Sequence, residues 1–220
     1  MLYQLQLGEL LPYWREFAAG ALFTIVLTLT TTVVGVGVGI VGASLRMFGP
    51  RWVDTAVGAY VETIRNTPFI VQLFFIFFGL PALGVKLTEA QAAFLAMTIN
   101  LGAYSIEIVR AGLKASPKGQ IEAAESLALS RIQILAHVLI LPALRRVWPA
   151  LSSQIVIVML GSSVVSQISA EDLTYAANLV QSRNFRAFES YLVATVIYLA
   201  LALLLRAALR RLGARIFAGA

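Results

Sequence analysis

Cysteine is absent from the 220-residue chain, and histidine occurs only once, at His137. Disulfides and thiolate metal sites are therefore excluded, and a single histidine cannot supply an HExxH zinc motif. We interpret His137 as an ordinary loop residue and expect no metal site. Charged residues are also scarce, at 13% of the chain, whereas 59% of the residues are hydrophobic. A soluble domain is closer to half apolar, so the composition predicts an integral membrane protein.

Sequence motifs for catalysis are missing as well. A phosphate-binding loop needs a glycine directly before its lysine, and none of Lys86, Lys114 and Lys118 follows a glycine. No GxSxG motif occurs, and the acidic residues form no obvious catalytic pair. We therefore expect no catalytic residue, no cofactor and no enzyme activity in this chain, so any ATP hydrolysis must take place in a partner.

Five apolar segments predict five transmembrane helices and an all-α integral membrane fold. They cover residues 18–45, 69–80, 90–106, 147–170 and 191–205. The second segment has an amphipathic lead at residues 54–65, and we expect Thr67-Pro68 to kink it. The first segment is too long for the apolar part of a signal peptide and follows Glu9 and Glu16, so we expect it to remain as an anchor.

The first apolar segment is unusually rich in glycine, at Gly35, Gly37, Gly39 and Gly42. Small residues allow helices to pack closely in lipid, and we take packing as their main role. A role in lining a pore is the alternative.

The formal net charge of +6 comes from basic residues that cluster at the ends of the apolar segments. This placement is typical of orientation signals rather than of a nucleic-acid surface. With the N-terminus outside, the outer segments keep only Arg15, Lys86, Arg183 and Arg186. The positive-inside rule thus predicts an N-out, C-in topology, with the long loop before the fourth span in the cytoplasm.

That loop, within residues 115–154, is the most polar stretch between two spans. Ser116-Pro117 predicts a helix start, with serine as the N-cap and proline as the first helical residue. Ser130 and Gln133 have the spacing of a capping box for a second helix, which Pro142 should stop or kink. One face of this helix should carry Ile132, Leu135, Ala136 and Leu139. The pattern predicts a short helical hairpin suited to docking.

Glu122-Ala123-Ala124, followed by Leu127, Ser130, Val138, Pro142 and Pro149, resembles the EAA loop of ABC importer permeases. The resemblance implies a cytoplasmic loop at about residues 112–148 whose helix docks in a groove of a separate ATPase subunit. The implied coupling residues are Glu122, Ala123, Ala124, Leu127, Ala128, Ser130 and Arg131. For Glu122 the alternative is a solvated loop acid.

Three positions depart from the usual pattern of this loop. Ala128 replaces its glycine, Ser153 replaces its asparagine, and Leu141-Pro142 falls about one residue late. We expect alanine for glycine to be a mild change in a helical turn.

Other segments resemble the polar-amino-acid branch of these permeases, the histidine/glutamine/arginine type. Residues 61–74 follow its VExxRGTPxxVQLF pattern with Asn66 in place of the glycine, and a GLP triplet ends at Pro81. Residues 103–112 resemble its AYxxEixRgg segment. Residues 160–173 resemble its K-x-(S/T)-S-L…S…(E/D)L run, with Leu160 in place of the lysine.

The resemblance covers about residues 18–209 of one transmembrane domain, residues 1–220, and implies the MetI-like type I importer fold. It implies a multi-pass permease of the bacterial inner membrane that moves polar or charged amino acids, or close derivatives, by alternating access. The implied partners are an ATPase dimer that binds ATP and Mg²⁺, a second identical or paralogous permease, a periplasmic binding protein and membrane lipid.

Ionisable residues at membrane depth are candidates for function because burying them is expensive. The candidate substrate path comprises Glu62, Arg65, Gln72, Asn100, Tyr104 and Glu107. Glu62/Arg65 and Glu107/Arg110 share a Glu-x-x-Arg spacing, so each pair is also expected to close on itself at a helix end. Both interpretations stay open here.

Two other classes of function also stay open. An ion-coupled secondary amino-acid transporter would need no ATPase, although no inverted repeat is evident in the sequence. A membrane scaffold or receptor subunit would bind partners without moving a solute.

Overall fold

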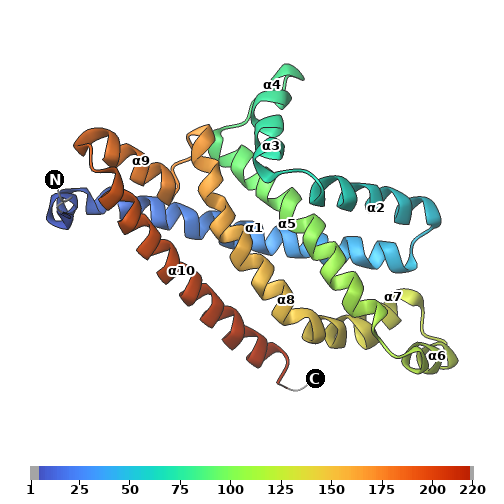
Figure 1. Ribbon diagram of the computed structural model, residues 1–220. Helices are drawn as coiled ribbons and strands as arrows, with labels where there is room; N and C mark the ends of the chain where they lie inside the picture. The colour runs from blue at the N-terminus through green and yellow to red at the C-terminus, as the bar shows by residue number, and fades with distance from the viewer. Residues whose placement is uncertain (1–4, 219–220) are drawn as a thin grey trace. The chain divides into compact units, whose positions relative to one another are not determined.

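The structure is a computed structural model that describes residues 5–218, all of them in helices and their connections (Figure 1). The membrane-length helices are α1 (Trp14–Phe48), α5 (Glu89–Lys114), α8 (Ile140–Gly161) and α10 (Ala187–Ile216). Shorter helices are α2 (Arg51–Arg65), α3 (Phe69–Phe74), α4 (Leu80–Ala82), α6 (Lys118–Ser126), α7 (Arg131–Gln133) and α9 (Leu173–Asn184). The 3₁₀ segments are η1 (Leu7–Tyr13) and η4 (Ser162–Ile168), and the π segments are η2 (Phe75–Gly79) and η3 (Ile134–Leu139).

Four helical stretches in the described chain are long and apolar enough to cross a membrane, and a bent pair of shorter stretches supplies a fifth if it counts as one span. The bent pair joins α2 to α3–α4 at an angle of 108°. The side chains of Asn66 and Thr67 bond back to the carbonyls of Glu62 and Thr63, at 2.8 Å each, and Pro68 follows without an N–H to continue the ladder. The kink expected at Thr67-Pro68 is confirmed.

The fourth and fifth spans begin earlier than the sequence suggested. Helix α8 begins at Ile140 and contains both Pro142 and Pro149, whereas we expected the span to start at residue 147. Pro142 therefore does not stop the helix, and the π segment η3 lies directly before the α8 turn that contains it. Helix α10 begins at Ala187, four residues before the expected start of the apolar run.

The chain packs as two compact units, and the four long helices contribute residues to both. The first unit comprises residues 5–31, 69–97 and 156–205. Its core joins η1, the start of α1, α9 and α10, through Leu10, Phe17, Leu173, Ala176, Ala177, Val180 and Ala194. A single transmembrane domain stays a prediction.

A buried polar group, Asp172, begins helix α9 in this first unit. The carboxylate accepts a hydrogen bond from the Tyr175 N–H at 2.9 Å and another from the Tyr198 hydroxyl at 2.7 Å. Burial raises the pKa of Asp172 from 3.8 to about 6, against the opposing effect of these hydrogen bonds. Asp172 is therefore an N-cap whose charge is costly in the folded state.

The second unit comprises residues 32–68, 98–155 and 206–218. In it α1 and α5 approach closely where Gly35, Gly39 and Gly42 face Leu101, Ser105 and Ile106. A Cβ added at Gly39 would lie 3.0 Å from the carbonyl carbon of Ser105, whereas one added at Gly37 would meet nothing within 4 Å. Three of the four glycines thus have the packing role expected of them, and Gly37 does not.

This contrast predicts opposite outcomes for two substitutions in one helix. Gly39→Leu should destabilise the protein by about 3 kcal/mol or more, because α1 and α5 must separate to admit the side chain. Gly37→Leu should be neutral or stabilising by about 1 kcal/mol, since leucine favours helix over glycine. Thermal denaturation of the purified protein in detergent measures both, and equal loss of stability in the two variants would contradict the assignment.

The raised pKa of Asp172 predicts a pH-dependent stability. Because the folded-state pKa lies above the unfolded value, protonated Asp172 stabilises the fold below about pH 4, and this contribution is lost as the pH rises through about 6. The loss should approach about 3 kcal/mol. The Asp172→Asn variant lacks this titration, so its denaturation midpoint should rise relative to that of the wild type between these pH values. Parallel pH curves for the two proteins would refute this.

Candidate functional site

The helical hairpin of α6 and α7 is held by its inner side in the core of the second unit. Ala124, Ile134 and Leu139 of this stretch are buried, with at most 4% of each residue exposed. They pack in one cluster with Ala43 of α1, Val109 and Leu113 of α5 and Ala143 of α8. The Arg146 guanidinium also donates a hydrogen bond to the carbonyl of Ala115 at 2.8 Å. The hairpin is therefore rigidly attached to three long helices.

The outer side of the same hairpin is polar with two large apolar side chains. Glu122, Ala123 and Ser126 are exposed on α6. Leu127 and Ile132 are 76% and 79% exposed, in a stretch that is otherwise polar. Exposed apolar side chains beside a charge are typical of a surface that a partner covers. This side has the chemistry of a docking surface.

The turn that joins the two helices matches its sequence signals in part. The Ser130 hydroxyl accepts from the Gln133 N–H and the Gln133 side chain accepts from the Ser130 N–H, so the predicted capping box is confirmed. The predicted start of the first helix was one residue early, because Pro117 is the N-cap and Lys118 the first helical residue. Ser116 provides no side-chain cap there.

The predicted apolar face of the second helix was wrong in part, because Leu135 and Leu139 pack in the core as expected and the other two members do not. Ile132 and Ala136 are exposed, whereas Ile134 and Leu139 are buried. The reason is that α7 has only three residues before the wider π turns of η3 begin, and these rotate the side chains away from a regular helical period. Ala124, which we grouped with the docking residues, lies in the core of the hairpin instead.

Ala128 is strained, contrary to our expectation of a mild change. Its φ of 56° lies in the left-handed region. The N–H of Leu129 donates a hydrogen bond to the carbonyl of Ala124 at 3.2 Å. The N–H of Ala128 donates one to the carbonyl of Glu125 at 2.9 Å. These two bonds form a Schellman motif, whose left-handed position favours glycine because an L side chain crowds the carbonyl there.

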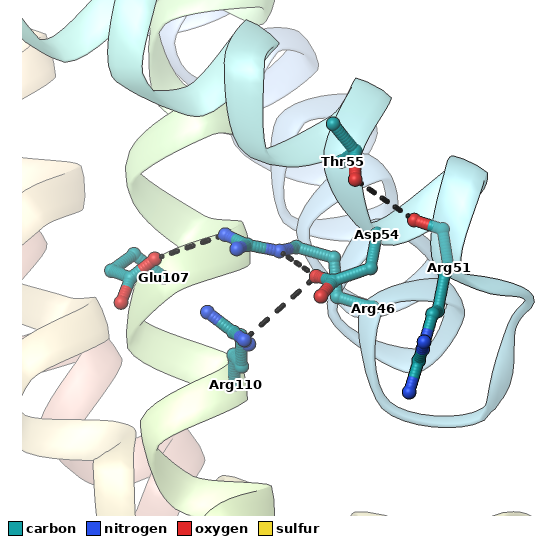
Figure 2. Close-up of polar contacts among 6 residues, drawn as sticks. All are labelled: Arg46, Arg51, Asp54, Thr55, Glu107 and Arg110. Atoms are coloured by element: carbon teal, nitrogen blue, oxygen red, sulfur yellow. Dashed lines mark hydrogen bonds and ion pairs between the residues drawn. The ribbon is translucent and has the colours of Figure 1, made fainter.

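A cluster of four charges joins α1, α2 and α5 in the second unit (Figure 2). Arg46 lies at its centre, 2.8 Å from the Asp54 carboxylate and 3.4 Å from that of Glu107. Arg110 adds an ion pair with Asp54 at 3.8 Å. The two arginine side chains are only 12% and 18% exposed, so each needs its anionic partners. Two positive and two negative groups make the cluster neutral.

The structure corrects both predicted Glu-x-x-Arg pairs. Glu107 pairs with Arg46 and Arg110 with Asp54, rather than with each other. Within residues 5–218 no ion pair joins Glu62 to Arg65, and the Arg65 guanidinium instead lies 5.4 Å from the centre of the Tyr104 ring. The structure thus brings together Arg65 and Tyr104 of the candidate path, and it places Glu107 in a network with residues that we had not selected.

The remaining candidate path residues belong to different units. Asn100, half-buried on α5, lies in the second unit with Glu62, whereas Gln72, which is buried, lies on α3 in the first. We missed Arg46 and Asp54 because they lie eight residues apart in separate helices. The signal was the Gly49-Pro50 turn between them, which reverses the chain and lets the two helices lie together. No group of acids and histidine able to hold a metal ion occurs within the described residues.

Comparisons with known proteins agree with this geometry. Residues 35–218 match the family model of the binding-protein-dependent transport system inner membrane component. The chain is 34% identical to the probable glutamine ABC transporter permease protein GlnP of Bacillus subtilis, over 89% of this chain and 91% of that protein.

Two solved structures share the fold. The crystal structure of an amino acid ABC transporter with histidines has a TM-score of 0.86 at 32% identity, covering 97% of this chain and all of that one. An inward-facing MetNI methionine ABC transporter has a TM-score of 0.80 at 21% identity, covering 94% and 98% of the two chains. The prediction of a MetI-like type I importer fold is confirmed, and the N-out, C-in orientation stays a prediction.

The strain at Ala128 predicts that glycine is the better residue there. Ala128→Gly should stabilise the protein by about 1 kcal/mol, because it removes the steric cost of the left-handed conformation. Ala123→Gly, five residues earlier within α6, is the matched control and should destabilise by about 1 kcal/mol. Denaturation midpoints in detergent test the opposite signs, and a loss of stability in both variants would contradict the Schellman assignment.

Proposed function

This chain belongs to the family of binding-protein-dependent transport system inner membrane components, and from this premise we propose that it is the permease subunit of an ABC importer for polar or charged amino acids. Its N-terminus lies outside and its C-terminus in the cytoplasm of a bacterial inner membrane. A periplasmic binding protein delivers the substrate, and a second permease subunit completes the pathway. A separate ATPase dimer binds ATP and Mg²⁺ and drives the transport. The likeness to an amino acid ABC transporter along 97% of the chain supports the substrate class.

The observation that carries this proposal is the two-sided hairpin. Its inner side is buried against α1, α5 and α8, and its outer side exposes Glu122 beside Leu127 and Ile132. We assign the outer side as the docking surface for the ATPase, formed by Glu122, Ala123, Leu127, Ala128, Ser130 and Arg131, with Ala124 as its internal anchor. A movement of the docked ATPase then acts on three membrane helices at once.

The translocation path is a second part of the same proposal. The candidates Glu62, Arg65, Asn100, Tyr104 and Glu107 lie in the second unit, and Gln72 in the first. Arg65 over the Tyr104 ring offers a cation beside an aromatic face, which suits the carboxylate end of an amino acid. Glu107 is held by Arg46, so we give it a role in positioning the helices that border the path.

Retention of the ATPase during purification tests the docking surface. The tagged chain is co-expressed with its candidate ATPase, solubilised in detergent and purified as wild type, Glu122→Lys and Leu127→Asp. Both changes lie on exposed positions, so the chain should still fold and insert, but each should weaken retention by about tenfold or more.

The matched control is Glu89→Lys, which reverses an exposed acid at the opposite end of α5 from the hairpin. It should retain the ATPase as the wild type does. Equal retention by wild type, Glu122→Lys and Leu127→Asp would remove this surface from the coupling mechanism. If even the wild type retains no ATPase, the hypothesis of an ion-coupled secondary transporter is favoured instead.

A further inference from the structure

The first unit contains a hollow lined by residues of α1 and α9 and by Glu171. It has a volume of about 490 Å³. The hollow exists because several of the residues that line it are small, namely Ala19 and Gly20 of α1 and Ala176 of α9. Gly20 in particular lets α1 approach the backbone of Leu173, at 2.9 Å from where a Cβ would stand. Farther along α1, Leu22, Phe23 and Val26 make the lining apolar.

A second hollow of about 350 Å³ continues the first along α1. It is lined by Leu27 and Thr30 of α1 and by Ala90 and Phe94 of α5, and it shares Phe23 and Val26 with the first hollow. The two together run from Glu16 to Thr30, which is about 21 Å along a helix axis. One leaflet of the hydrocarbon core is about 15 Å deep, so this groove is long enough for an extended acyl chain.

The mouth of the groove carries charges of both signs. Glu16 lines it and forms an ion pair with Arg183 of α9 at 3.5 Å. Glu171 also lines it, is exposed, and makes no ion pair within the described residues. Trp14 and Arg15 directly precede Glu16, and both are residue types that favour the membrane interface. The mouth therefore offers the Glu171 carboxylate to a cation, and the half-exposed Arg183 guanidinium lies beside it, next to the lining residue Glu16.

We propose that this groove binds one phospholipid whose headgroup carries a primary ammonium and a phosphate, as in phosphatidylethanolamine. The ammonium meets Glu171, the phosphate meets Arg183, and one acyl chain lies along Ala19, Phe23 and Val26. A primary ammonium forms charge-assisted hydrogen bonds with a carboxylate. The headgroup of phosphatidylglycerol has no cationic group and cannot form them. The exposed Leu22 and Val26 on this stretch of α1 open the groove to the bilayer side, from which a lipid enters.

The test is native mass spectrometry of the assembled complex, titrated separately with phosphatidylethanolamine and with phosphatidylglycerol. The wild type should bind one phosphatidylethanolamine per chain more tightly than it binds phosphatidylglycerol. Ala19→Phe fills the groove from an exposed position and should weaken this binding by more than about tenfold, since it excludes at least two methylenes. Ala18→Phe is the matched control, because Ala18 is exposed and lines neither hollow, and it should bind as the wild type does.

A charge variant tests the headgroup contact separately. Glu171→Gln should reduce the preference for phosphatidylethanolamine by about three- to fivefold, as expected for one exposed ion pair. Equal binding of the two lipids by the wild type, or equal binding by Ala19→Phe and Ala18→Phe, would overturn the proposal. So would separation of the two permease chains by Ala19→Phe alone, because a second copy would then be covering the groove. None of these variants touches the hairpin, so the outcome is independent of ATPase docking.

Discussion

The close approach of α1 to α5 is the constraint on which the second unit depends. Gly39 and Gly42 let α1 lie against Ser105 and Ile106 without side chains between the backbones. One turn farther along α1, and directly after Ile106 on α5, the same approach brings Arg46 to Glu107 at 3.4 Å. The ion pair then reaches Asp54 and fixes α2 to the same two helices. Packing and electrostatics therefore cooperate along one interface. The glycines set a short distance between the helices, and this distance lets the opposite charges form ion pairs.

The end of α5 carries this constraint into the hairpin. Val109 and Leu113 follow Glu107 on α5 and form the core against which Ala124 and Leu139 pack. A substitution at Gly39 or Gly42 should therefore disturb the hairpin, because Gly42 directly precedes Ala43, which packs in the same cluster. The local strain at Ala128 fits this picture, because a left-handed alanine persists only where its surroundings over-determine the backbone. Here those surroundings are the two Schellman hydrogen bonds and the buried Ala124 before them.

Features coded by adjacent residues could be predicted from the sequence, and features decided by distant partners could not. The apolar spans, the break at Pro68 and the capping box at Ser130 each depend on a few neighbouring residues. The Glu107/Arg110 pair failed because a helical pair three residues apart contributes only about 0.2–0.5 kcal/mol, which a charge on another helix easily exceeds. Glu107 had Arg46 available, 61 residues away in the chain. The π turns of η3 likewise go with the burial of Ile134 and Leu139 in the core, and the hydrophobic periodicity of the sequence gives no sign of them.

The two units therefore differ in what they offer a partner. In the second, every long helix that meets the hairpin supplies at least one small or branched side chain to a single cluster, as Ala43, Val109 and Ala143 do. Such a cluster cannot yield at one helix without repacking the others, since protein interiors are close-packed and transmit displacement. In the first, a groove lies beside the close contact of Gly20 with α9, and Glu16 and Glu171 line it. Under the proposed function, the cluster of the second unit suits the transfer of force from an ATPase, and the groove of the first unit suits a lipid that can exchange without disturbing the core.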